Sequence, residues 1–217
     1  MFELNLPADK CYDSIGTLDI ETSGFDGDSD DLIAIGVGYH ELGSDDADVT
    51  MFSRKNVVGD ETDVIRSAYE WLNDRDPEAL VSYGADFFDL TFLGDKIEAL
   101  GFSDCPTLAC ASEHVDLLEI RKPIADEMNK KWPSLEEALD YYEIPECVTT
   151  WEGAKLDNTR FGEELAPKYI ESLPEDGREQ WDALEQTVLK YTESDIEANI
   201  ALYAADTGHE YMPTYAL

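Results

Sequence analysis

The first third of the chain alternates short apolar runs with turn-forming residues, a pattern that is typical of β-strands. Three runs rich in β-branched residues predict strands over 14–21, 31–40 and 48–54. The connections between them are short and rich in Gly, Asp and Ser. Because consecutive strands joined by short connections usually pair side by side, we expect an antiparallel meander of these three strands.

From residue 61 onward the hydrophobic period changes from that of a strand to that of a helix. The pattern predicts a helix over 61–75, a strand over 79–84 and a second helix over 85–101, which Gly101 ends. We expect a fifth strand over 114–122, and the remaining periodic segments predict helices over 134–143, 164–173 and 177–208. A meander followed by βα units favours an α/β fold, with a mixed five-stranded sheet flanked by helices in one domain over residues 1–217.

The composition adds a large excess of acid to this pattern. The chain has 50 Asp and Glu against 15 Lys and Arg, a formal charge of −35, yet 43% of its residues are hydrophobic and 11% aromatic. A disordered acidic tail would be poor in aromatic residues, so the acid decorates a folded body. Self-repulsion of this size is tolerable where salt shortens the screening length to about 3 Å near 1 M. We therefore expect a halophilic protein, and an acidic protein that mimics or repels nucleic acid is the alternative.

Cysteine usage and the hydropathy pattern bear on the compartment. The cysteines form no CxxC pair, and we expect them to be reduced and mostly packed, with a disulfide or zinc role as the alternative: Cys11, Cys105, Cys110 and Cys147. The N-terminal segment has neither the basic region nor the apolar region of a signal peptide. No apolar run reaches the roughly 18 residues of a membrane-spanning helix. These features predict a cytoplasmic protein without a membrane partner.

Asp19 and Glu21 lie within the first predicted strand, separated by one residue. With 50 acids among 217 residues, about 11 such pairs are expected by chance, so the spacing alone is a weak motif. Their context is more specific, because the two side chains share one face of a strand that follows an apolar run and ends at a turn. Two neighbouring carboxylates repel each other unless a cation lies between them. We therefore expect a divalent metal here, with a solvated strand end as the alternative.

Two more acids are distinguished by their positions. Asp89 lies at the start of a predicted helix, directly after a strand, which places it at the end of the sheet. Asp195 lies four residues after Tyr191, so both side chains project from one face of the last helix. Glu193 and Glu197 lie on other faces of that helix, and we expect them to be solvated.

Three segments, in chain order, resemble the exonuclease motifs of the DEDD superfamily, which has a ribonuclease H-like fold. They are "LDIETSG", "YGADFFDLTFL" and "YTESD". The third is similar to the motif of the DEDDy branch, which includes the 3′–5′ proofreading domain of family B DNA polymerases and stand-alone relatives. The resemblance extends from about residue 14 to 203, and "WEGAKLDNTRFGEELAPKYIE" is similar to the segment before the third motif in those relatives. Gly84 departs from the Asn that many relatives have in the second motif.

The resemblance implies a metal-dependent 3′–5′ exonuclease with two divalent ions, Mg²⁺ or Mn²⁺. It implies that Asp19, Glu21 and Asp195 hold the first ion. Asp19 would bridge to a second ion, which Asp89 would support partly through water, and Tyr191 would hydrogen-bond the attacking water. Two ions can activate this water on one side of a phosphodiester and stabilise the leaving oxygen on the other.

The resemblance and the residue types also suggest contacts with substrate. Thr22 and Ser23 follow the first carboxylate pair and are expected to meet the terminal nucleotide. Phe25 is a candidate for stacking on the last base, with a buried core position as an equal alternative. Lys130 and Lys131 precede a tryptophan and form the best candidate for a basic contact patch, against the alternative of simple surface lysines.

The expected substrate is the 3′ end of a single-stranded nucleic acid, with DNA favoured, and repair or replication proteins are the partners to consider. Two alternatives remain open. One is a catalytically idle nucleic-acid-binding or assembly module of the same fold. The other is a structure-selective endonuclease, an activity that ribonuclease H-like folds also support.

Overall fold

A computed structural model describes residues 4, 6–85, 88–173 and 179–216, and it confirms the predicted mixed five-stranded sheet flanked by helices. The strand order is β3-β2-β1-β4-β5. The strands are β1 (Ser14–Thr22), β2 (Leu32–Glu41), β3 (Ala47–Ser53), β4 (Ala79–Ser82) and β5 (His114–Asp116). The first three pair antiparallel, as the meander predicts, and β4 runs parallel to β1 and to β5. The carboxyl ends of β1, β4 and β5 therefore meet at one edge of the sheet.

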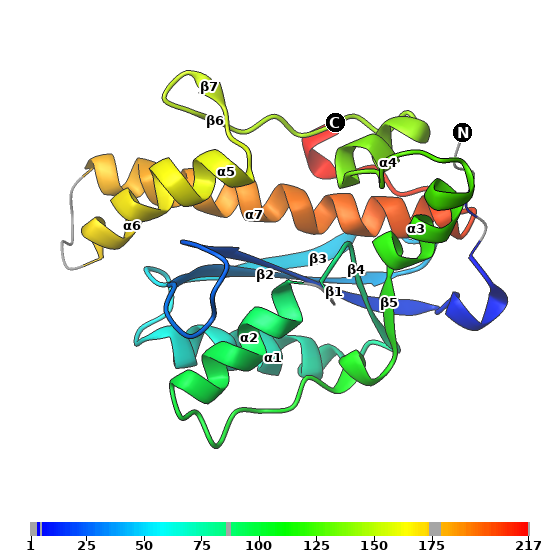
Figure 1. The fold of residues 1–217 in the computed structure, drawn as a ribbon. Coiled ribbons are helices and arrows are strands. Elements are labelled where there is room, and N and C mark those ends of the chain that lie inside the picture. Colours follow the sequence, from blue (N-terminus) through cyan, green and yellow to red (C-terminus); the bar gives the residue numbers. More distant parts are fainter. Residues whose placement is uncertain (1–3, 5, 86–87, 174–178, 217) are drawn as a thin grey trace.

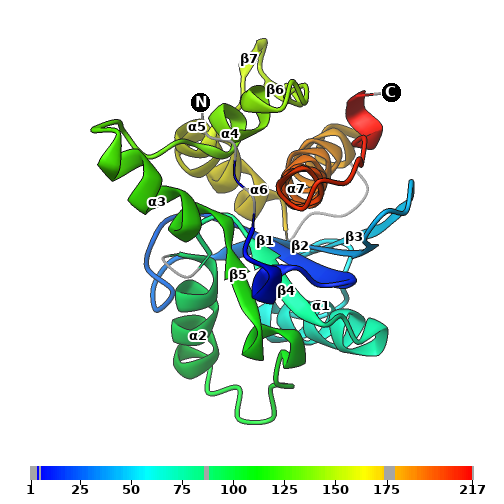
Figure 2. The same ribbon diagram turned by 90° about the vertical axis from the view of Figure 1, so that its right-hand side faces the viewer.

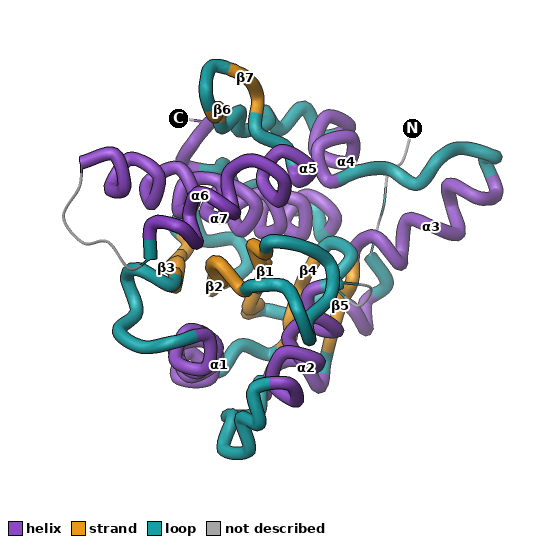
Figure 3. The backbone as a smooth tube through the Cα atoms, turned by 60° about the vertical axis from the view of Figure 1, so that its left-hand side comes forward, coloured by secondary structure: helices purple, strands orange, loops and turns teal. Residues whose placement is uncertain are grey.

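Helices cover both faces of this sheet, as Figure 1 and Figure 2 show. The helices are α1 (Glu61–Arg75), α2 (Asp89–Ala99), α3 (Leu117–Glu127), α4 (Leu135–Tyr141), α5 (Asn158–Arg160), α6 (Ala166–Ser172) and α7 (Glu179–Asp206). α1 and α2 lie against one face, and the long α7 crosses the other. A small hairpin of β6 (Thr150–Trp151) and β7 (Ala154–Lys155) precedes α5, and a π-helical turn, Phe161–Leu165, joins α5 to α6. Figure 3 shows α5 and α6 side by side with α7, above the ends of β1 and β2.

The segment predicted as a strand over 114–122 is a strand only as far as Asp116, and the rest of that prediction was wrong. The side chain of Asp116 accepts hydrogen bonds from the backbone N–H groups of Leu118 and Glu119, so it caps α3 at its first turn. It also accepts one from the N–H of Gly84 at 2.8 Å. One carboxylate thus ends β5, begins α3 and fixes the turn after β4.

One predicted helix begins later than the pattern indicated. The second helix starts at Asp89 rather than at residue 85, after Gly84 has turned the backbone with a φ of +87°. Residues 86 and 87 lie outside the described residues, as do the first two residues of the helix predicted over 177–208.

The close packing of α7 on β2 depends on glycines in the strand. A Cβ at Gly36 would lie 2.7 Å from the side chains of both Thr192 and Ile196, and one at Gly38 would lie 2.7 Å from Ile196. Only glycine permits this approach, because real Cβ atoms do not come so close to other heavy atoms. The helix therefore lies low over the sheet, and its residues near position 195 reach β1.

Two observations concern the wider character of the protein. All four cysteines are free. Within the part of the chain that the structure describes, no helix is both long and apolar enough to cross a membrane.

Candidate active site and metal centre

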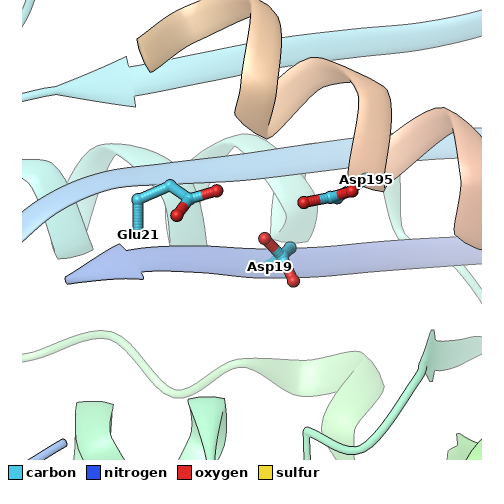
Figure 4. A group of neighbouring side chains, drawn as sticks. All are labelled: Asp19, Glu21 and Asp195. Atoms are coloured by element: carbon cyan, nitrogen blue, oxygen red, sulfur yellow. The ribbon is translucent and has the colours of Figure 1, made fainter. Parts of the chain in front are cut away.

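Three carboxylates from two elements meet above the carboxyl end of β1. Asp19 and Glu21 project from the same face of the strand, and Asp195 projects toward them from α7 (Figure 4). One carboxylate oxygen of each lies within 4.8 Å of those of the other two. Glu21 is buried, and Asp19 and Asp195 are partly buried. The structure thus brings together residues that are 176 positions apart in the sequence.

The electrostatics of this cluster favour a bound cation. Burial, followed by repulsion from neighbouring acids, raises the pKa of Asp19 and of Glu21 well above the usual range. Burial, followed by the charges of Glu136 and Asp89, raises the pKa of Asp195 to about 7. Among the described residues, no Lys, Arg or His forms an ion pair with any of these acids. Three hard oxygen donors without a basic partner fit a divalent ion such as Mg²⁺ or Mn²⁺.

Asp89 is a fourth carboxylate near this cluster but not within its closest group. It is the first residue of α2, it is buried, and it lines the same cavity of about 520 Å³ as Asp19 and Glu21. Burial raises the pKa of Asp89 to about 7, and a hydrogen bond with the backbone of Ile20 opposes the shift. Its negative charge is among the causes of the raised pKa of Asp19. Asp89 is therefore placed to act on the cluster from across the cavity.

Tyr191 lies one helical turn before Asp195, and two contacts fix its side chain, one at the hydroxyl and one at the ring face. The hydroxyl donates a hydrogen bond of 2.6 Å to Oδ1 of Asn158, and the ring stacks on Phe161 with centroids 5.4 Å apart. Burial and the charges of Glu21 and Asp195 raise the pKa of Tyr191, so its hydroxyl stays protonated at neutral pH. Sequence reasoning missed Asn158 and Phe161, although both lie in "LDNTRF", part of the segment that is similar to relatives.

Phe25 stands at the mouth of the 520 Å³ cavity, and the alternative of a buried core position for it was wrong. Its side chain is 89% exposed, and its ring meets Phe88 edge-on with centroids 5.7 Å apart. Thr22 and Ser23 also line this cavity, but their hydroxyls are engaged within the turn. Thr22 donates to the carbonyl of Gly24 at 2.6 Å, and Ser23 accepts from the backbone of Asp31 at 2.8 Å. Both hydroxyls therefore shape the loop that presents Phe25.

Lys130 and Lys131 do not lie among the carboxylates. They line a separate groove of about 480 Å³ after α3, together with Trp132, which is 48% exposed. The indole N–H of Trp132 donates to Asp126 at 2.9 Å, which fixes the ring at the surface.

Glu197 is buried, so the prediction that it is solvated was wrong. Its two carboxylate oxygens accept hydrogen bonds from the backbone N–H and the hydroxyl of Thr214, at 2.8 and 2.7 Å. The segment near the C-terminus covers this face of α7, which the helical pattern alone does not reveal. Glu193 is partly buried.

Comparison with known proteins places this arrangement in a family. The sequence model of the RNase_H superfamily matches residues 17–205, which include Asp19, Glu21, Asp89 and Asp195. The chain belongs to the RNase_H superfamily. RNase H-like domains are generally hydrolytic nucleases that use divalent metals. The carboxylate cluster of this RNase H-like domain is a candidate site for such an ion.

A similar solved structure is that of the family B DNA polymerase from the hyperthermophilic archaeon Pyrobaculum calidifontis. The TM-score is 0.51 and the sequence identity 19%, over 88% of this chain. The matched region is 27% of the polymerase chain, so this RNase H-like domain spans about a quarter of that protein. At this identity the likeness shows the fold alone. No curated protein matches the sequence.

Proposed function

We propose that this RNase H-like domain is a two-metal-dependent 3′–5′ exonuclease that hydrolyses single-stranded nucleic acid, with DNA favoured. The observation that supports this most directly is the meeting of Asp19, Glu21 and Asp195 within 4.8 Å, with Tyr191 one turn away on α7. This is the tyrosine-containing arrangement that the sequence motifs resemble.

In this proposal the carboxylates bind the metal ions and Tyr191 positions the attacking water. Asp19, Glu21 and Asp195 would hold one divalent ion, and Asp19 together with Asp89 would serve a second. When bound, such ions activate a water for in-line attack and stabilise the leaving oxygen. The Tyr191 hydroxyl donates its hydrogen bond to Oδ1 of Asn158, so its oxygen keeps lone pairs that can accept a hydrogen bond from the attacking water.

The substrate end would lie in the 520 Å³ cavity. The exposed ring of Phe25 offers a face for the terminal base, and base–aromatic stacking is worth about 1–3 kcal/mol. Thr22 and Ser23 line the same cavity. Lys130 and Lys131 would contact phosphates further along the strand, where the groove beside Trp132 continues.

The charge of −35 sets the conditions under which this function should be sought. Phosphate contacts weaken as salt rises, so in molar salt base stacking and metal-bridged phosphates would have to carry the binding. We propose that the protein works in concentrated salt, where its self-repulsion is also screened.

The test is degradation of 5′-labelled single-stranded DNA and RNA in molar KCl with Mg²⁺ or Mn²⁺. We expect a ladder that shortens from the 3′ end. Asp19→Asn should lower the rate by at least about 1,000-fold, because a lost ligand removes several kcal/mol of metal-based stabilisation. Tyr191→Phe should lower it about 10- to 100-fold, the value of one hydrogen bond to the reacting water.

Asp28→Asn is the matched control, because Asp28 is an exposed acid in the turn that follows β1. It should leave the rate unchanged. Oligonucleotide products in place of mononucleotides would indicate an endonuclease. Intact substrate in every metal and salt condition, with circular dichroism showing a folded protein, would contradict enzymatic function and favour the idle binding module.

A further inference from the structure

The loop of residues 23–31, here called the Phe25 loop, is closed by hydrogen bonds at its base. The backbone N–H of Ser23 donates to the carbonyl of Asp31 at 2.9 Å, and the backbone N–H of Asp31 donates to Oγ of Ser23 at 2.8 Å. The loop lies beside the carboxylate cluster and itself carries four aspartates, at positions 26, 28, 30 and 31. Like charges repel, so contacts with the rest of the protein are needed to keep this loop in place.

One face of α2 supplies such contacts. Phe88, Phe92 and Lys96 follow one another at intervals of four residues, so they lie along a single side of the helix. The ring of Phe88 meets that of Phe25 edge-on, with centroids 5.7 Å apart. A Cβ at Gly27 would lie 2.5 Å from the carbonyl oxygen of Phe92, so the loop packs directly on the backbone of α2.

Lys96 makes the third contact, and it is the only buried lysine in the part of the chain that the structure describes. Its ammonium group donates to the carbonyl of Asp30 at 2.5 Å and lies 3.6 Å from Oε1 of Glu61. The same oxygen of Glu61 accepts from the backbone N–H of Leu32 at 2.6 Å, where the loop enters β2. Lysine is rarely buried without such partners, because desolvation of the ammonium group is costly. This one side chain therefore joins the end of the loop to α2 and to the start of α1.

Arg54 also approaches the Phe25 loop, but its contact is weaker. Its guanidinium group lies 3.8 Å from Oδ1 of Asp31, and the side chain of Asp31 is 44% exposed. An exposed pair at this distance contributes little in concentrated salt. Lys96 is thus the cation whose contact with the loop is both short and shielded from solvent.

We propose that Lys96 is a positioning residue for the substrate, which keeps the Phe25 loop on α2 and so fixes the ring of Phe25 over the 520 Å³ cavity. The proposal rests on the proposed exonuclease function, which places the terminal base against Phe25. Asp89 is the first residue of the same helix, so α2 sets the place of this ring relative to a proposed metal ligand. Lys96 itself touches neither. Without it, the loop must be ordered when the strand end binds, which weakens binding and leaves the chemical step unchanged.

The first test measures kcat and KM of the full chain on single-stranded DNA in molar KCl with Mg²⁺. Phe25→Ala should raise KM about tenfold, the scale of one lost stacking contact. Lys96→Met keeps the apolar stem of the side chain, and it should raise KM about five- to tenfold and change kcat less than twofold. Lys168→Met is the matched control, because the side chain of Lys168 is 44% exposed on α6, and it should change neither constant.

The double variant Phe25→Ala/Lys96→Met separates positioning from a general effect. If Lys96 acts through Phe25, the KM of the double variant should lie within about twofold of that of Phe25→Ala alone. Independent effects would multiply to about 50-fold or more, and that result would overturn the proposal. A merely structural role for Lys96 would lower the fraction of folded protein. This would reduce kcat at an unchanged KM, which would also overturn the proposal.

Amide hydrogen exchange tests the same contact without any catalytic activity. In Lys96→Met the amides of Ser23 and Asp31, which close the loop, should exchange about tenfold faster than in the wild-type protein, while those of α1 keep their rates. Unchanged exchange at these two amides would overturn the proposal even in an active enzyme. Failure of the exonuclease proposal looks different, because the wild-type protein would then leave the strand intact whatever the exchange rates are.

Discussion

Helix α7 carries two buried or partly buried aspartates that differ in what surrounds them. Asp206, at its end, is almost fully buried, and Nη2 of Arg121 donates to both of its carboxylate oxygens at 2.8 Å. The hydroxyl of Tyr142 donates a further hydrogen bond of 2.7 Å. Asp195, three turns earlier, faces Asp19 and Glu21 and has no basic partner among the described residues.

We interpret this difference as one between a structural charge, Asp206, and a charge with a proposed function, Asp195. The chain supplies the cation for Asp206, so that site is complete when the protein folds and joins α3 to α7. Around Asp195 the described residues form no ion pair with it and add the negative charges of Asp19, Glu21 and Asp89, so we propose that a cation from solution completes this site. A buried acid is thus informative about function through its partners, and burial alone does not distinguish the two cases.

Isosteric substitution of each aspartate gives the largest expected effect. Asp206→Asn should lower the free energy of unfolding by about 3–5 kcal/mol, because it leaves the buried guanidinium of Arg121 without its counter-charge. Asp195→Asn in metal-free buffer should not destabilise the protein, because it removes one of several repelling charges. Urea unfolding of both variants in the same KCl concentration measures the two effects. An equal loss of stability in both would show that the contrast between the sites is wrong.

The sequence predicted the parts of this contrast that depend on short-range pattern. Strand periodicity put Asp19 and Glu21 on one face, and helical spacing aligned Tyr191 with Asp195. The pairing of Arg121 with Asp206 joins residues 85 positions apart, and no local pattern reveals it.

The wrong predictions also arise from contacts that short-range sequence patterns do not reveal. The strand predicted over 114–122 fails because Asp116 caps a helix there, and Asp116 looks like any other acid in a chain that has 50 of them. Glu197 seemed solvated because the segment that buries it lies 17 residues further along. Asn158 gains its meaning only from Tyr191, 33 residues away, whose hydroxyl the fold places beside it.

Divalent metal should produce the next largest effect. At a concentration of 100 times its dissociation constant, Mg²⁺ or Mn²⁺ should stabilise the wild-type protein by about 2.7 kcal/mol, since it binds the folded state alone. Asp206→Asn should show the same gain from a lower starting stability. Asp195→Asn should lose most of it. Thermal unfolding at constant ionic strength measures this, and an equal gain in all three proteins would place the bound metal elsewhere.

The smallest expected effect is the dependence of stability on pH, which tests the same comparison of Asp195 with Asp206. The pKa values of Asp89 and Asp195 are raised to about 7 in the folded protein, against about 4 for an unfolded carboxyl. Between these values the folded state binds more protons than the unfolded state, so the metal-free protein should lose stability as the pH rises from 4 to 7. Solvent in the open cavity reduces the size of this loss to about 1–2 kcal/mol.

Above pH 7 this contribution should be constant. Asp195→Asn should flatten the slope, and saturating Mg²⁺ should remove most of it, because a bound cation favours the ionised carboxylates in the folded state. The quantity to compare is the free energy of unfolding of wild type minus that of Asp195→Asn at each pH, because this subtraction cancels the contribution of the many exposed acids. Suppose that, without metal, the free energy of unfolding of wild type minus that of Asp195→Asn rises with pH between 4 and 7. A basic group of the chain would then already neutralise Asp195, and the site would resemble that of Asp206.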